Sequence, residues 1–167
     1  GFGKEQYQDT LRSAIDLGPE HISVYQLTYE KGSVFEKKKL NKEIPLLTEE
    51  EEIEIFLITR DTLQKAHSTG SGQAGHTHYE ISNYARPGYQ SRHNLKYWNG
   101  EEYIGLGAGS HSFVNEKRCA FSADIDTYIK QMLSGDYRFE VEEYIDEEKR
   151  KWDEVAFGLR LIQGIDL

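Results

Sequence analysis

Residues 76–82 read HTHYEIS and alternate with a period of two. The pattern predicts a strand in which His76, His78, Glu80 and Ser82 share one face. Imidazole, carboxylate and hydroxyl groups on one face are costly to bury without hydrogen-bond partners. Two interpretations follow: the face lines a concave functional interior, or it belongs to an edge strand and is solvated.

Helical and strand-like segments alternate along the whole chain. Thr48 and Glu51 predict a capping box at the start of one helix, and Gly18-Pro19 ends another. The segments between, such as the lysine-rich residues 31–47 and an acidic linker before residue 146, are interpreted as solvated connections. The expected helices span about residues 6–17, 48–66, 124–133 and 146–163, and the expected strands about residues 21–30, 76–84 and 103–106.

This alternation, with strands that are apolar or mixed on both faces, predicts an α/β fold with a parallel sheet covered by helices. Ligands bind at the carboxyl ends of the strands in such folds. Residues 28–31, 80–92 and 105–112 fall there and converge on one predicted site. Two or three strands make only part of a barrel, so we expect open sheet edges and a possible homodimer through them.

Composition excludes several classes of function. The 167 residues carry a net charge of -9, which argues against nucleic-acid binding because no broad basic surface is available. No apolar run approaches the ~20 residues of a membrane helix. The single cysteine, Cys119, excludes an intramolecular disulfide or a multi-cysteine metal cluster and indicates a reducing, cytoplasmic setting. The chain begins without methionine, so we expect a piece of a longer protein.

Three motifs have weak chemical interpretations. The glycines of residues 105–109 predict a tight turn or a close backbone approach to a phosphate or a flat cofactor. His76, His78 and Glu80 have the spacing for a divalent metal on one strand face, but no second cluster completes the site. Ser110 lies beside a histidine, yet no nucleophile elbow is present.

Residues 93–98, HNLKYW, are more informative. A histidine can ligate iron through one ring nitrogen while a hydrogen bond orients the other. Tyr97 and Trp98 offer flat apolar faces for a macrocycle. The carboxylates on its rim have three candidate partners, Arg86, Arg92 and Lys96. The alternative is a loop pinned by aromatic side chains, in which His93 is a structural hydrogen-bonding group.

The segments HYEISNYARPGYQSRHNLKYW and EEYIGLGAGSHS closely resemble the HemW-type branch of the oxygen-independent coproporphyrinogen III oxidase-like family. Members are radical S-adenosylmethionine (SAM) proteins. The upstream segment LGPEHISVYQLTYEKGSVF matches the same family, and DEVAFGLRLIQGIDL resembles the start of its C-terminal domain. The resemblance covers nearly the whole chain, and HNLKYW fits the HNxxYW signature associated in this branch with haem binding.

The resemblance implies an α/β fold: the C-terminal half of an incomplete (β/α) radical SAM barrel, leading into a small helical C-terminal domain. Residues 1–139 would form the partial barrel, and residues 140–167 would begin the helical domain. The implied function is that of a haem chaperone, which binds haem and delivers it to client proteins. The alternative is an oxygen-independent coproporphyrinogen III oxidase, an enzyme of haem biosynthesis that removes propionate carboxyl groups oxidatively.

The resemblance also implies roles for particular residues. It suggests that Thr28, at a strand end, and His111, in the glycine turn, lie near SAM in the intact barrel. His93 becomes the haem-iron ligand, with three residues completing the motif: Asn94, Tyr97 and Trp98. No catalytic residue is assigned. Strand-end position and charge add Glu80 and Arg86 as weaker candidates.

The chain departs from the family pattern in two places. The CxxxCxxC motif, which holds [4Fe–4S] and activates SAM, is absent, so the cluster and SAM would belong to the full-length protein. We therefore expect this chain alone to lack radical chemistry. Residues 67–74 are an insertion before the central motif and are interpreted as a lengthened loop.

Overall fold

A computed structural model describes residues 3–66 and 75–165. The chain divides into two compact units, Gly1–Gln90 and Ser91–Leu167, and each is described by itself. We call them the first and the second unit. The insertion predicted at residues 67–74 lies outside the described residues.

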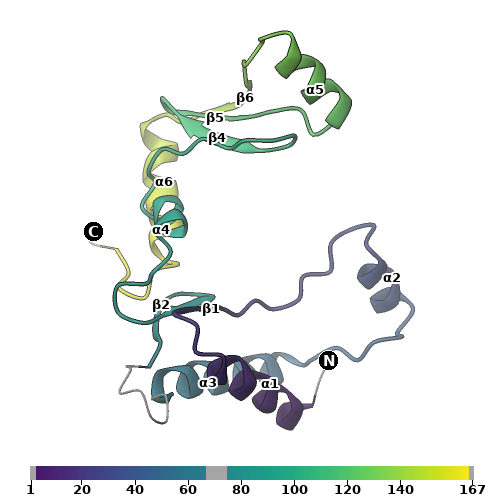
Figure 1. Cartoon of the computed structure of the whole chain (residues 1–167), viewed down its shortest axis with the longest axis vertical. Coiled ribbons are helices and arrows are strands. Elements are labelled where there is room, and N and C mark those ends of the chain that lie inside the picture. Colours follow the sequence, from purple (N-terminus) through teal and green to yellow (C-terminus); the bar gives the residue numbers. More distant parts are fainter. Residues whose placement is uncertain (1–2, 67–74, 166–167) are drawn as a thin grey trace. The chain divides into compact units, whose positions relative to one another are not determined.

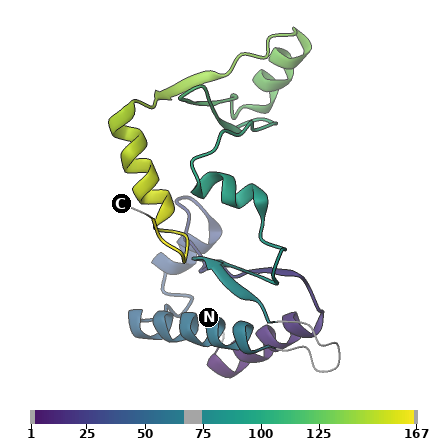
Figure 2. The ribbon, with the colours of Figure 1, turned by 90° about the vertical axis from the view of Figure 1, so that its left-hand side faces the viewer.

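The first unit packs helices against a small sheet. Its sheet has the strand order β1-β3-β2, and both pairings are antiparallel. Helices α1 and α3 run beneath this sheet (Figure 2). Leu11 of α1, Leu63 of α3 and Tyr84 of β3 form the buried core of the unit. The elements are α1 (Lys4–Asp16), β1 (His21–Ser23), α2 (Val34–Leu40), α3 (Glu49–Lys65), β2 (Thr77–Glu80) and β3 (Asn83–Ala85).

Local capping explains the helices of this unit. At α3, the Thr48 hydroxyl accepts from the Glu51 amide and the Glu51 carboxylate accepts from the Thr48 amide, which confirms the predicted capping box. Helix α2 lies within the lysine-rich segment interpreted as a solvated connection. Ser33 caps it by accepting from the Glu36 amide, a signal that the lysine-rich composition obscured.

The strand predictions for this unit need two corrections. The expected strand over residues 21–30 ends at Ser23, and the expected strand over residues 76–84 folds back on itself between Glu80 and Asn83. Both strands pair antiparallel, so the predicted parallel pairing is wrong for the described residues. The Glu80 carboxylate causes the reversal in part, because it accepts from the Ser82 amide at 2.8 Å and closes a tight turn.

The second unit contains a separate antiparallel sheet with the strand order β4-β5-β6 (Figure 1). Helix α5 connects β5 to β6, and its Tyr128 ring meets the Phe121 ring edge-on at 5.4 Å. Helices α4 and α6 contact each other. The elements are α4 (Arg92–Trp98), β4 (His111–Val114), β5 (Lys117–Ala120), α5 (Ile125–Leu133), β6 (Glu140–Tyr144) and α6 (Glu147–Gly158).

The helices expected at about residues 124–133 and 146–163 are confirmed as α5 and α6, and Asp124 and Asp146 cap them by accepting from the Thr127 and Lys149 amides. Helix α6 ends at Gly158, earlier than predicted. The expected strand at residues 103–106 is reduced to one isolated bridge between Tyr103 and Phe113. Strands β4, β5 and β6 were not predicted, because their short mixed segments become strands only by pairing with one another.

The predicted mixture of helices and strands is therefore confirmed, whereas the parallel arrangement is not. The division into a partial barrel, residues 1–139, and a helical domain, residues 140–167, stays a prediction. Among residues 3–66 and 75–165, no helix has the length and apolar character needed to cross a membrane.

An aromatic cleft beside a short helix

The motif of residues 93–98 forms most of helix α4, not the loop that we expected. Ser91 begins the helix by accepting a hydrogen bond from the Asn94 amide at 3.3 Å. One helical turn separates His93 from Tyr97, so their side chains lie on the same face. The Tyr97 hydroxyl lies 3.0 Å from His93 Nε2, and the two rings are nearly perpendicular, with centroids 4.9 Å apart. His93 is exposed and Tyr97 is half-buried.

Tyr97 and Trp98 line a cleft of about 360 Å³ within the second unit. The Tyr97 ring packs edge-on against Tyr103 at 4.4 Å, and Trp98 lies 6.4 Å from Phe157 of α6. This volume lies within the range of small-ligand sites. The other residues around the cleft are Asn99, Gly100, Glu101, Phe113, Arg118, Ile145, Arg150, Asp153 and Glu154.

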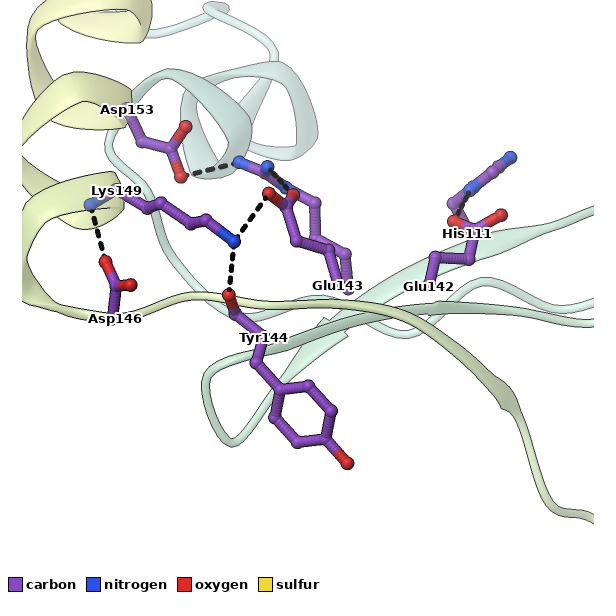
Figure 3. Close-up of polar contacts among 8 residues, drawn as sticks. His111, Glu142, Glu143, Tyr144, Asp146, Lys149 and Asp153 are labelled. Atoms are coloured by element: carbon purple, nitrogen blue, oxygen red, sulfur yellow. Dashed lines mark hydrogen bonds and ion pairs between the residues drawn. The ribbon is translucent and has the colours of Figure 1, made fainter.

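A network of charged side chains lies along one side of this cleft. Arg118 of β5 donates to Glu143 of β6 at 2.6 Å and to Asp153 of α6 at 2.5 Å. The hydrogen bond to Asp153 is the main cause that raises the pKa of Arg118, and the Arg118 hydrogen bond lowers the pKa of Glu143. Figure 3 shows Lys149 also reaching Glu143 and the Tyr144 carbonyl oxygen. The network joins the sheet to α6.

Trp98 has two features that matter for binding. The guanidinium of Arg160 lies 4.2 Å from the centre of its indole ring, a cation–π contact. The indole Nε1 is buried, and no described residue accepts its hydrogen bond. A buried donor without an acceptor carries a desolvation cost, which an acceptor on a bound molecule would remove.

Comparison with known proteins gives a consistent result. The chain is 30% identical over 158 residues to the heme chaperone HemW of Bacillus subtilis, covering 95% of this chain and 40% of that protein. It is 38% identical over 138 residues to the heme chaperone HemW of Buchnera aphidicola, covering 82% of this chain and 34% of that protein. The chain belongs to the HemW-type family. The family assignment made from the sequence is thereby confirmed.

The HemW protein of Mycobacterium tuberculosis shows the same likeness, with 29% identity over 170 residues, 100% of this chain and 42% of that protein. The chain thus spans roughly 34–42% of the length of these relatives. No family model and no solved structure matches the chain.

The polar strand face from which the HemW-type motif begins is buried in the first unit. His78 stacks on Tyr84 with centroids 4.4 Å apart and meets Phe56 of α3 edge-on at 5.7 Å. His76 Nε2 lies 2.9 Å from the Pro19 carbonyl oxygen. For these two histidines, neither a solvated edge nor an open functional lining is correct, because both are buried: His76 is hydrogen-bonded to the Pro19 carbonyl, and His78 packs against Phe56 and Tyr84.

Glu80 leaves the face that His76 and His78 were expected to share with it. The β2–β3 register shifts after His78, so Glu80 pairs opposite Asn83 and lies 2.5 Å from its side-chain nitrogen. A bulge of this kind re-aims one side chain. Among the described residues no group of three potential ligands is placed to hold a metal ion, so the weak metal interpretation gains no support.

The bulge creates a polar network that the sequence did not predict. The Ser23 hydroxyl donates to Asn83 at 2.5 Å, and His21 Nε2 lies 2.9 Å from the Tyr79 hydroxyl. Burial lowers the pKa of His21, and the nearby carboxylate of Glu80 opposes this shift. The only available signal was the alternation of His21 and Ser23 in the expected strand.

The two residues that resemblance to the HemW-type family assigns near SAM are exposed. Thr28 follows β1 in the first unit, outside regular structure. His111 begins β4 in the second unit, and its Nδ1 lies 3.1 Å from a carboxylate oxygen of Glu142 on β6 (Figure 3). Arg86, a weaker candidate, is half-buried after β3, and no described residue accepts from its Nε. Roles for these residues stay predictions.

Proposed function

We propose that this chain carries the haem-binding site of a haem chaperone, with haem as the cargo that is passed to a client protein. The observation that carries the proposal is the exposed His93 one helical turn from Tyr97, which lines an aromatic cleft. Imidazole is a common axial ligand of haem iron, and flat aromatic side chains suit a macrocycle. Relatives at 30% and 38% identity are named heme chaperones.

The cleft residues fit such a cargo chemically. Tyr97, Trp98 and Phe157 offer apolar ring surface, and Trp98 Nε1 is a buried donor for an acceptor on the cargo. Arg150, at the cleft, is paired with Glu116 at 2.7 Å, but both side chains are about half exposed or more. Such an exposed ion pair contributes little, so Arg150 can exchange it for a carboxylate of the macrocycle at small cost.

The proposal includes a longer protein in which this chain completes part of a radical SAM barrel. No described strand pairs with the outer edge of β1, and the strand-forming residues 25–30 that follow it belong to no strand; both features support such a completion. The [4Fe–4S] cluster does not fit the residues of this chain, which has one cysteine, Cys119, and that thiol is buried. SAM and cluster chemistry would therefore need other residues. A cytoplasmic location and a homodimer complete the proposal.

The alternative function is oxidative decarboxylation of coproporphyrinogen III by the longer protein. Two assays distinguish these functions: a chaperone must bind haem stably, whereas an oxidase must turn over coproporphyrinogen. The names of the relatives favour the chaperone.

Titration of the 167-residue chain with ferric haem, followed by the Soret band, tests the proposal. We expect saturable binding, and we expect His93→Ala to weaken it by about tenfold or more, because an axial bond is lost. His111→Ala is the comparison, since His111 is another exposed histidine of the second unit and its ring contacts Glu142, whereas the His93 ring contacts Tyr97 of the cleft. Equal affinities for wild type and His93→Ala, or equal losses in both variants, would contradict the proposal.

A further inference from the structure

The Tyr97 hydroxyl is hydrogen-bonded to one particular atom of His93, the proposed haem ligand. It lies 3.0 Å from Nε2 of His93, the ring nitrogen farthest from the main chain. The other ring nitrogen, Nδ1, is bonded to the ring carbon that carries Cβ. A wide, flat macrocycle is more hindered at Nδ1, which lies next to Cβ and the main chain, than at Nε2 on the far side of the ring. Iron therefore needs the nitrogen that Tyr97 occupies.

The phenol ring of Tyr97 is held in place independently of this hydrogen bond. It packs against Tyr103 with centroids 4.4 Å apart, meeting that ring edge-on. His93, by contrast, is exposed at the surface of α4. Release of the hydrogen bond therefore requires only a rotation of the His93 side chain, and the cleft lining stays unchanged.

We propose that the His93–Tyr97 hydrogen bond is a latch that controls access of haem iron to His93. Without haem, the hydroxyl donates to the Nε2 lone pair and keeps this nitrogen from other metals and hydrogen-bond donors. When the macrocycle enters the cleft, His93 turns away from Tyr97 and its Nε2 lone pair binds iron. The inference rests on the proposed haem-binding function and adds a regulation of the same site: Tyr97 sets how readily the ligand is released.

The variant Tyr97→Phe removes the hydroxyl and keeps the ring, so the latch alone is lost. We expect ferric haem to bind about two- to tenfold more tightly, the change that corresponds to one net hydrogen bond. Iron-free protoporphyrin should bind the variant and the wild type equally, because it needs no ligand nitrogen. Tyr137→Phe is the matched control, since Tyr137 is 67% exposed in the same unit and lies outside the cleft lining.

A second set of experiments tests whether the gain in haem affinity depends on His93. In a His93→Ala background, the gain from Tyr97→Phe should vanish, because the latched group is absent. Ring ¹⁵N chemical shifts of His93, measured without haem, should change on Tyr97→Phe and stay constant on Tyr137→Phe. The ¹⁵N measurement tests the latch contact without any ligand.

Four results would overturn the latch: unchanged or weaker haem affinity in Tyr97→Phe, an equal gain for iron-free protoporphyrin, a gain that persists in the His93→Ala background, or unchanged ¹⁵N shifts. Failure of the proposed function has a different signature. There, the wild type would not bind haem, or His93→Ala would bind it normally, while the ¹⁵N shifts still report the hydrogen bond.

Discussion

Arg118 on β5 donates a hydrogen bond to Asp153 on α6 across 2.5 Å, and this contact ties the sheet of the second unit to the helix beside the cleft. The same guanidinium binds Glu143, so one side chain links three elements. The side chains of Arg118 and Asp153 are 31% and 25% exposed, so the pair is only partly screened by solvent. The cleft wall therefore depends on a charged contact as well as on aromatic packing.

Replacement of Arg118 by methionine should destabilise the chain by about 1–2 kcal/mol. The change leaves Asp153 without its cation, and the partial exposure reduces the cost below that of a fully buried pair. Urea denaturation measures the effect. Arg138→Met is the control, because the Arg138 pair with Asp136 is exposed and should matter little. Equal stability of the Arg118 variant and the wild type would show that the network is not structural.

Replacement of the two tryptophans should have different effects on haem affinity. Trp98→Ala should weaken ferric haem binding by about tenfold or more, because the ring surface and the buried Nε1 donor are lost. Trp152→Ala should bind haem as the wild type does, since Trp152 is 68% exposed on α6 and does not line the cleft. Soret titration of both variants, with circular dichroism to confirm folding, makes the comparison. Similar affinities for the two variants would place the haem elsewhere.

Tyr84 should make the folded state sensitive to alkali. Burial raises the pKa of Tyr84 to about 12 from its ordinary value of 10.0. The folded state therefore favours the neutral phenol, so this contribution is complete below pH 10 and is lost as the pH rises toward 12. Urea midpoints measured between pH 9 and 12 should fall less steeply for Tyr84→Phe than for the wild type. Parallel curves would exclude Tyr84 as the group responsible.

Gly105→Ala should disrupt the turn that leads into β4. A Cβ at this position would meet the His111 carbonyl group and would lie 2.9 Å from Ser110 Cβ. Backbone cannot move aside cheaply, so we expect a loss of roughly 2 kcal/mol, as for other overpacked sites. Ala108→Ser, at an exposed position of the same turn, is the control. Thermal unfolding of the two variants gives the measurement, and a stable Gly105→Ala protein would show that the turn is open.

Sequence patterns predicted four helices because their signals are local. Thr48, Asp124 and Asp146 each accept from an amide three residues ahead, and such contacts depend only on neighbours in the chain. Helix α4 was not predicted because its seven residues include one aliphatic side chain, Leu95, which is too few for an apolar stripe. The sequence nevertheless singled out its motif as the most informative segment, since family resemblance depends on residue identity and not on conformation.

The sequence by itself determined the helices with clear caps, the family and the residues 93–98 on which the proposed site depends. The tertiary structure alone decided the antiparallel pairing, the bulge that turns Glu80 toward Asn83, and the burial of His76 and His78. It also decided which partners surround Tyr97 and Trp98. The physical reason is range: a helix cap is settled within four residues, whereas strand pairing and cleft walls join segments that only folding brings together.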